Sequence, residues 1–353
     1  MKRNFGIILL ALCCVVAVGC KKDPVEPVDP VVPSEDLIAG DVWVLNEGGW
    51  GNNDAELSVL NRAEGSVEND IFVAKNGRGL GDVAQDLMVY GSKMYVVVWG
   101  SNVVEVLNSK TGKSIKQISF AGKGPRYAVG EGGKVYVCCY DGTVAKIDTV
   151  GLEIEACCEV TGMQPEGICV AGDKLCVLHG WKNDENGNAV YDSTMSVVDI
   201  ATFSSERKMT VGLNPFYVMA YDENHVIVGY NGNYGVQPSG IMKVNLTTGE
   251  RTTLKNDGAS EFVIYQGELY GYQFDWSSNK AAFWKINLAT GAQTDLLKNI
   301  TVDIKTPYCM SVDPRNGDIY VGDAQQFRSS GDVHCFTKDG ELKWSVEVGM
   351  RTR

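Results

Sequence analysis

Apolar and polar residues alternate over short stretches along most of the chain, and residues 124–158 show this pattern most completely. Four segments there are rich in β-branched and aromatic residues, with Gly, Asp or Pro between them: Arg126 to Val129, Val135 to Cys139, Thr143 to Asp148 and Ile154 to Cys158. Alternation over such short lengths is typical of half-buried strands, and no helical period of comparable length competes with it. The pattern predicts a small antiparallel sheet.

The same order of segments returns along the chain. New units start at Asp82, Gly124, Gln164, Asn214, Gly258 and Thr306, which are 40 to 50 residues apart, and the segments Asp41 to Leu45 and Glu56 to Asn61 indicate an incomplete first unit. Four strands in about 40–45 residues is the spacing of propeller blades. The sequence therefore predicts an all-β fold, a single seven-bladed β-propeller with four-stranded antiparallel blades and an incomplete first blade.

The repeat pattern is incomplete where the first and last units must meet to close the ring. Each later unit opens with a strand such as Pro307 to Val312, whereas the first unit starts at what corresponds to a second strand, Asp41 to Leu45. Its missing strand would have to follow Val348, where only the polar residues Gly349 to Arg353 remain. We expect a chain end shortened relative to its relatives, a first blade that is three-stranded or poorly closed at its centre, and fraying of Asp41 to Asn61.

The N-terminus has the layout of an export signal. Lys2 and Arg3 precede an uncharged run from Phe5 to Gly19, which is short for a membrane span but suits a signal-peptide core. Residues 17–20 resemble a bacterial lipobox, with Ala17 where Leu is usual, and Cys20 would be lipidated. An ordinary secretion signal with an incidental cysteine is the alternative. We expect residues 1–19 to be a lipoprotein signal peptide, 20–40 a lipidated cysteine and Pro-rich tether, and 41–353 the propeller.

This layout predicts an outer-membrane, lipid-anchored protein that faces the cell surface, although Lys21 and Lys22 interrupt the acidic run often associated with surface export and leave the orientation open. The net charge of -12 argues against nucleic acid and against docking on anionic lipid. Membrane attachment would then depend on the lipid anchor alone.

The cysteines beyond the signal lie at strand positions: Cys138, Cys139, Cys157, Cys158, Cys169, Cys176, Cys309 and Cys335. Neighbours in a strand face opposite sides, so neither adjacent pair can point into one metal site. Small buried residues are favoured over disulfides between neighbouring strands.

Catalytic patterns are weak. The three histidines, His179, His225 and His334, are scattered over three units without helical metal-binding spacing, and neither a nucleophile elbow nor a P-loop is present. The run Asn183 to Asn188 carries oxygen ligands but lacks the last carboxylate of an EF-hand, which favours a solvated loop over a calcium site. We expect no catalytic residue, no metal and no cofactor.

Large aromatic side chains are concentrated in the turns of one expected face. In a propeller, the turns before the innermost strands and the turns between second and third strands lie on the same side. The first set carries Arg126, Tyr127, Glu166, Phe216, Tyr217, Glu261 and Tyr308, and the second carries Trp50, Trp99, Tyr140, Trp181, Tyr230, Tyr234, Trp276 and Phe327. We expect long loops at Gly180 to Ser193, Asn231 to Ser239 and Ala324 to Gly331. We interpret both sets as ligand-binding residues for a small but bulky ligand, the alternative being that they cap the spaces between blades.

Several motifs resemble those of the YncE-like propeller lipoproteins of Bacteroidetes. They are Asn46 to Gly48, Trp50, Asn53, Ala55 to Ser58, Gly77, Leu80 to Gln85, Asn245 to Gly249, Asn287 to Gly291 and Asp313 to Asp323. The resemblance covers roughly residues 41–348 and implies a seven-bladed, lipid-anchored fold with a ligand on the loop face. The best-understood members of this family resemble surface cobalamin-binding proteins that cap a TonB-dependent outer-membrane transporter.

The resemblance therefore implies a binding protein that passes cobalamin or another corrinoid to such a transporter. Two other classes stay open. One is a propeller enzyme of the lactonase or lyase type, for which the three histidines give little support, and the other is a protein-interaction or adhesion scaffold.

Overall fold

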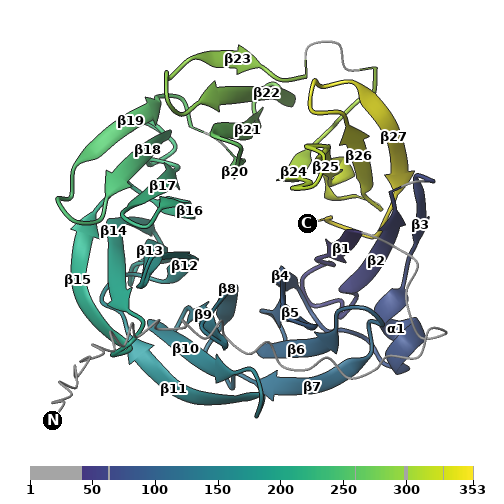
Figure 1. Ribbon diagram of the computed structural model, residues 1–353, viewed down its shortest axis with the longest axis horizontal. Coiled ribbons are helices and arrows are strands. Elements are labelled where there is room, and N and C mark those ends of the chain that lie inside the picture. Colours follow the sequence, from purple (N-terminus) through teal and green to yellow (C-terminus); the bar gives the residue numbers. More distant parts are fainter. Residues whose placement is uncertain (1–41, 63, 259, 298–300, 329, 353) are drawn as a thin grey trace, which may run out of the picture.

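Seven antiparallel sheets form a ring around a central axis in the computed structural model, which describes residues 42–62, 64–258, 260–297, 301–328 and 330–352 (Figure 1). Six sheets have four strands each and the first has three. The predicted all-β, seven-bladed propeller with an incomplete first blade is therefore confirmed. The expected signal peptide, lipidated cysteine and tether lie outside the described residues.

Each blade is one sheet whose strands follow one another from the ring axis outward. Blade one is β1 (Val42–Asn46), β2 (Glu56–Asn61) and β3 (Ser66–Glu68), and blade two is β4 (Ala84–Tyr90), β5 (Lys93–Val98), β6 (Val103–Asn108) and β7 (Ser114–Ser119). Blade three is β8 (Pro125–Glu131), β9 (Lys134–Cys139), β10 (Thr143–Asp148) and β11 (Glu153–Glu159), and blade four is β12 (Pro165–Ala171), β13 (Lys174–Asn183), β14 (Ala189–Asp199) and β15 (Ser204–Thr210).

The second half of the ring repeats this order. Blade five is β16 (Pro215–Asp222), β17 (His225–Tyr230), β18 (Gly240–Asn245) and β19 (Arg251–Lys255), and blade six is β20 (Glu261–Tyr265), β21 (Glu268–Asp275), β22 (Lys280–Asn287) and β23 (Gln293–Asp295). Blade seven is β24 (Pro307–Val312), β25 (Ile319–Asp323), β26 (Asp332–Phe336) and β27 (Leu342–Glu347).

The core lies between the blades, because middle strands such as β5 and β9 bury both of their faces against neighbouring sheets, whereas outermost strands such as β15 are mostly exposed. Cys139 packs with Tyr95 and Val97 of blade two, whereas Cys138 packs with Leu175 and Val177 of blade four. The prediction that adjacent cysteines face opposite sides is confirmed. Each such buried aliphatic side chain contributes about 1.5–3 kcal/mol, so these layers supply most of the stability.

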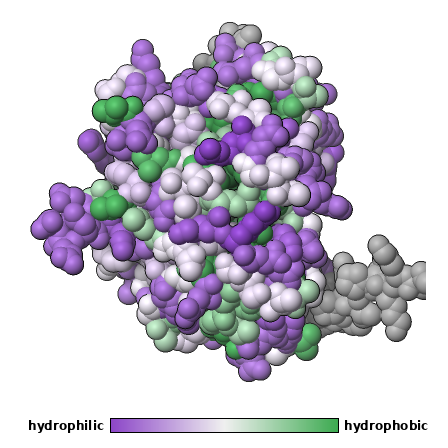
Figure 2. Space-filling model, turned by 90° about the vertical axis from the view of Figure 1, so that its left-hand side faces the viewer, coloured by the Kyte–Doolittle hydropathy of each residue, from purple (hydrophilic) through white to green (hydrophobic). Residues whose placement is uncertain are grey.

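The outer wall of the ring looks different. Viewed from the side of blades four and five, the wall is mostly hydrophilic, and its hydrophobic residues are in small separate patches (Figure 2). No helix among the described residues has the length and apolar character needed to span a membrane.

The expected loop Gly180 to Ser193 is wrong, because β13 and β14 continue through it as a hairpin in which Trp181 pairs with Tyr191 and Lys182 with Val190. The alternating residues of the second arm supply cross-strand partners that extend the ladder. The remaining turn is closed by the Asp184 carboxylate, which accepts the N–H groups of Asn186 and Asn188, both at 2.8 Å.

One short helix, α1 (Ile71–Asn76), also departs from the prediction. It is too short to show a helical period in the sequence. Glu56 of β2 accepts the N–H groups of Phe72 and Val73 at 2.6 and 3.1 Å, and the Phe72 side chain is fully buried. Tertiary contacts rather than local propensity therefore hold the helix.

Blades seven and one close the ring mainly through side chains. Val44 and Leu60 pack with Tyr320, Val333 and Val348. An ion pair between Arg62 and Asp313, with atoms 2.8 Å apart, crosses the same seam. The Tyr308 hydroxyl also donates to the Glu47 carboxylate at 2.7 Å across the seam. The seam is thus a blade-to-blade core with polar links.

The chain end lies near the centre of the ring, beside β1 (Figure 1). Thr352 forms one isolated bridge with Asn46, and the N–H groups of Glu47 and Gly48 donate to the carbonyls of Arg351 and Met350 at 3.0 and 3.3 Å. Thr352 is fully buried. A single bridge thus takes the place of the innermost strand that the other blades have.

We predict that ending the chain at Val348 loosens blade one and leaves the distant blades intact. The truncation removes the bridge and both backbone hydrogen bonds to Glu47 and Gly48, and blades depend mostly on their neighbours. Hydrogen exchange should accelerate in β1 while β9 keeps its protection, and the melting temperature should fall. Unchanged protection of β1 would show that the chain end contributes nothing to closure.

Candidate functional site

One backbone hydrogen bond recurs at the same place in blades two, three, four, five and seven. In each of these blades, the second strand pairs with the innermost strand. The residue that follows the last such pair donates its backbone N–H to a carbonyl in the turn before the innermost strand. The pairs are Trp99 to Val83, Tyr140 to Gly124, Gly180 to Gln164, Asn231 to Asn214 and Ala324 to Thr306, at 2.9–3.1 Å. The two sets of turns therefore lie on one face of the ring, as predicted, and we call it the loop face.

A β-bulge recurs at the start of the innermost strand in the same five blades. The register shifts just after Ala84, Pro125, Pro165, Pro215 and Pro307. The extra residues are Gln85, Arg126, Glu166, Phe216 and Tyr308. A bulge bends a strand and redirects the side chain of its extra residue, and such bulges occur next to binding sites.

Several residues that the sequence placed in turns belong to strands. Arg126 and Tyr127 lie in β8, Glu166 in β12, Phe216 and Tyr217 in β16, Glu261 in β20, Tyr308 in β24, Trp181 in β13 and Tyr230 in β17. The Pro that starts most of these strands pairs with the second strand, so the ladder begins earlier than the turn chemistry indicated. The bulge still directs part of this set toward the loop face.

An axial cavity of about 370 Å³ is lined by the innermost strands of all seven blades. The residue after each bulge, or its counterpart in blade six, lines it: Asp86, Tyr127, Gly167, Tyr217, Glu261 and Cys309. Asp86 accepts the N–H of Ala128 at 2.8 Å and Glu261 that of Met310 at 2.7 Å, so each carboxylate also ties two blades together. Burial and then Glu261 raise the pKa of Tyr217 well above its ordinary value, which keeps its hydroxyl protonated.

Five residues at the loop-face ends of blades one to four form a compact group, which we call the Arg126 cluster: Trp50, Trp99, Arg126, Tyr140 and Glu166. The guanidinium carbon of Arg126 lies 4.8 Å from the Trp99 ring centre and 4.7 Å from that of Tyr140. Trp50 in turn packs on Trp99 at 4.8 Å. This arrangement makes an aromatic wall backed by a buried cation.

Glu166 balances the charge of the Arg126 cluster. Its carboxylate accepts Nη2 of Arg126 at 2.5 Å and the Tyr140 hydroxyl. Burial alone would lower the pKa of Arg126, but Glu166 and the neighbouring tyrosines outweigh it and raise that pKa. Burial and then Glu166 raise the pKa of Tyr140. The cation stays charged, and its buried Nε has no hydrogen-bond partner among the described residues.

A surface pocket of about 370 Å³ opens beside this cluster. Trp50, Trp99 and Tyr140 line it together with the polar residues Asn102, Lys123 and Asp141. It therefore offers aromatic faces and hydrogen-bonding groups to the same ligand.

A second aromatic group, the Phe327 cluster, comes from blades six and seven and the chain end: Phe274, Trp276, Tyr308, Phe327 and Arg351. Trp276 stacks on Phe327 with ring centres 6.1 Å apart and planes 15° from parallel, and Phe274 meets Trp276 edge-on at 4.8 Å. Arg351 lies 5.5 Å over the Phe327 ring. Trp276 remains 65% exposed, so its outer face is available.

Three predicted residues lie outside these groups. Tyr230 packs into the core between blades four and five, which is the capping role. Tyr234 contacts Tyr191 of the β13–β14 hairpin, and Trp181 stands exposed on that hairpin. Sequence reasoning missed Gln85, Asp86, Phe274 and Arg351. Three of them could have been found: Gln85 and Asp86 hold the blade-two positions equivalent to predicted residues of other blades, and Phe274 lies two residues before Trp276.

The histidines do not converge on the axis. Both ring nitrogens of His179 have partners, the Met163 carbonyl at 2.9 Å and the Ser196 hydroxyl at 2.8 Å. His225 contacts Asp222 and Asn245. His334 lies with Asp323 and Asp332, the one group of potential metal ligands among the described residues.

No protein-family model matches the chain, and no curated protein matches it either. Solved structures do. A quinonprotein alcohol dehydrogenase-like protein from Bacteroides thetaiotaomicron matches with a TM-score of 0.63 and 13% identity, over 87% of this chain and 75% of that one. Kuenenia stuttgartiensis hydrazine synthase matches with a TM-score of 0.58 and 15% identity, over 74% of this chain and 85% of that one.

A computationally designed protein, Ika8, matches with a TM-score of 0.54 and 11% identity, over 76% of this chain and 87% of that one. At these identities the likeness shows a shared propeller fold and leaves the activity of this chain undecided.

We predict strong coupling between Arg126 and Glu166 in folding. Glu166→Gln leaves the buried guanidinium without its carboxylate and should cost about 3 kcal/mol of unfolding free energy, whereas Arg126→Met together with Glu166→Gln should cost less than the sum of the single changes. Urea unfolding measures all three. Lys123→Met, which breaks the more exposed pair with Asp141, should cost about 1 kcal/mol or less. Additive effects at Arg126 and Glu166 would disprove the coupling.

Proposed function

We propose that this protein binds a bulky, ring-containing nutrient on its loop face and passes it to a TonB-dependent outer-membrane transporter, without catalysing a reaction. A corrinoid such as cobalamin is the proposed ligand. The Arg126 cluster and the Phe327 cluster are the proposed contact surfaces. The axial cavity lies between the innermost strands, which also carry Arg126, Glu166 and Tyr308 of these clusters.

The observation that carries this proposal is the exposure of rigid aromatic rings on one face. Trp50 is 64% and Trp276 65% exposed, yet Trp50 packs at a tilt on Trp99 and Trp276 stacks on Phe327. Leaving such large apolar surfaces in water costs free energy unless a partner covers them, and rigid aromatic rings lose little entropy on binding. Exposed aromatic anchors of this kind are the usual energetic centres of a binding surface.

A corrinoid suits the chemistry around these rings. Its flat ring system can lie on Trp50 or Trp276, and its amide side chains can pair with polar groups such as Asn102, Lys123 and Asp141 at the pocket beside the Arg126 cluster. The resemblance to YncE-like lipoproteins also favours this ligand. Its Asn46 to Gly48 segment, however, holds the chain end here, so that motif supports the fold rather than the ligand.

Two other functions make different predictions for the same experiment. A propeller enzyme of the lactonase or lyase type would turn over lactones, and an adhesion scaffold would bind neither lactones nor corrinoids. Titration with cyanocobalamin, followed by tryptophan quenching, should show saturable binding by the proposed carrier. Capture of a cobalamin transporter by the purified protein, compared with and without ligand, tests the transfer step, and absence of both signals would reject the proposal.

For the binding surface, we predict that Trp276→Ala weakens cyanocobalamin binding by about 2 kcal/mol or more, because its exposed ring is a central contact. Stability should change little, since the side chain is mostly outside the core. Trp181→Ala is the matched control: this tryptophan is also exposed but lies on the β13–β14 hairpin and belongs to neither cluster, and its loss should leave affinity unchanged. Equal effects of the two substitutions would place the ligand elsewhere.

For the anchor, we predict that the mature chain begins at Cys20 and partitions with membranes, while Cys20→Ser remains unprocessed or appears in the soluble fraction. Thioether attachment of lipid requires the thiol, which serine lacks. Membrane fractionation with an electrophoretic mobility comparison measures this outcome. A Cys20→Ser protein that fractionates and migrates like the wild type would contradict the lipoprotein interpretation.

A further inference from the structure

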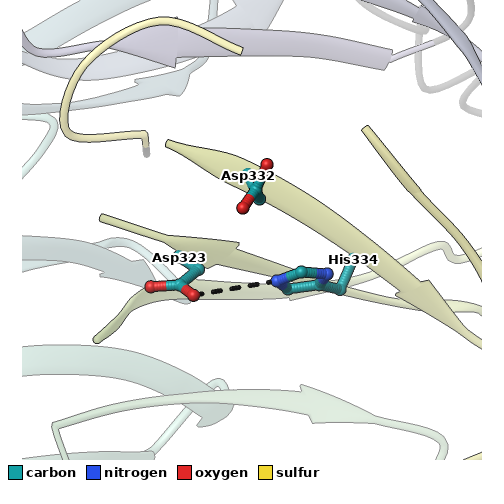
Figure 3. A group of neighbouring side chains, drawn as sticks. All are labelled: Asp323, Asp332 and His334. Atoms are coloured by element: carbon teal, nitrogen blue, oxygen red, sulfur yellow. Dashed lines mark ion pairs between the residues drawn. The ribbon is translucent and has the colours of Figure 1, made fainter. Parts of the chain in front are cut away.

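Three side chains with metal-binding atoms meet where β25 ends and β26 begins (Figure 3). Asp323 pairs directly with Asp332 across the two strands, and His334 follows Asp332 on the same face of β26. One ligand atom from each residue lies within 4.8 Å of the other two. The ladder itself therefore brings an imidazole and two carboxylates together.

His334 is oriented toward this group. Its Nδ1 lies 2.8 Å from the Ser345 hydroxyl, which fixes the ring, and its side chain is only 2% exposed. The buried Nε2 has no hydrogen-bond partner within the described part of the chain and faces Asp323 Oδ2 at 3.8 Å. That separation is too long for a hydrogen bond but close to the roughly 3.4 Å between two ligand atoms on one tetrahedral Zn²⁺ with bonds of about 2.1 Å.

The surroundings hold the two carboxylates in place. Asp323 accepts the N–H groups of Lys305 and Thr306 at 2.8 Å and that of Gln325 at 2.9 Å. The Gln325 amide nitrogen donates to both Asp323 and Asp332. A donor thus already bridges the carboxylates, while the amide oxygen of Gln325 accepts the Lys305 ammonium at 2.7 Å. An ion bound between the carboxylates would take the place of this amide nitrogen.

We propose that Asp323, Asp332 and His334 bind one divalent transition-metal ion, and that Zn²⁺ is the ion this ligand set suits. A buried imidazole selects zinc over calcium and magnesium, which prefer oxygen ligands alone. Ser345 is the supporting contact that keeps Nε2 directed at the metal. Half-buried Asp332 gives the ion a route from solvent.

The proposed ion has a structural role next to the loop face. Asp323 and Asp332 are the two ends of the segment that carries Gln325 and Phe327, and Asp323 also holds the turn before β24 through Lys305 and Thr306. A bound ion would fix both ends of this segment and with it the Phe327 ring. The proposal does not depend on which ligand the loop face binds.

Zinc titration of the chelator-stripped protein against a chromophoric chelator tests the proposal. The wild type should bind one high-affinity equivalent, and Asp332→Asn and His334→Gln should each weaken it at least tenfold. Asp332 is half-buried, so its variant should fold even where His334→Gln is unstable, and circular dichroism checks this. His179→Gln is the matched control, since both ring nitrogens of this buried histidine have protein partners.

Two further measurements exclude other sites. Co²⁺ in place of zinc should give d–d absorption without a thiolate charge-transfer band, which separates this site from one built on cysteines such as exposed Cys157. Ca²⁺ should compete at least tenfold more weakly than Zn²⁺. Wild-type zinc affinity in Asp332→Asn, no high-affinity equivalent in the wild type, or a thiolate band that follows the zinc stoichiometry would each overturn the proposal.

Discussion

The structure depends on the way five of its seven blades begin. A backbone hydrogen bond joins the turn before the innermost strand to the turn after the second strand, and a bulge follows directly in the innermost strand. Together they fix where strand pairing starts and bring two turns per blade to one face. Since the bulge redirects one side chain in each of these five blades, Arg126, Glu166 and Tyr308 can belong to a ladder and still contribute to the loop face.

This geometry also explains how an acidic protein keeps the buried guanidinium of Arg126 close to its loop face. Arg126 is bulged out of β8 into a ring of aromatic side chains, and the bulge of the next blade places Glu166 beside it. A buried charge without a partner would cost several kcal/mol, so neighbouring blades must keep their register for the pair to survive. The aromatic rings that cover the pair are then held rigid, which is what a binding surface requires.

Much of the fold could be predicted from sequence because blades are local, repeated units. Alternation of short segments gave the strand order, and the missing strand before Asp41 to Leu45 gave the three-stranded first blade. The Gly180 to Ser193 error arose because polar residues such as Asp192 and Ser193 can sit in an exposed hairpin as well as in a loop. Helix α1 could not be seen because Glu56, distant in sequence, holds its first turn.

The site was harder to predict, because it depends on where blades bring residues together. Type and spacing placed Trp50, Trp99 and Trp276 on the loop face, but could not separate them from Tyr230, which packs into the core. The Asp323, Asp332 and His334 group could not be recognised from sequence, because its residues meet through the pairing of two strands and lack the helical spacing of a metal-binding motif. Cross-strand register, which single-sequence patterns specify poorly, decides such groups.

A hydrogen-exchange footprint of the protein with and without cyanocobalamin tests most directly whether the loop face binds the ligand. We predict slower exchange, on binding, in the turns of the loop face around Trp50, Trp99, Trp276 and Phe327. The turns on the opposite face, such as residues 131–134 and 245–250, should exchange unchanged. Protection confined to that opposite face, or no protection at saturating ligand, would contradict the claim that the aromatic loop face is the binding surface.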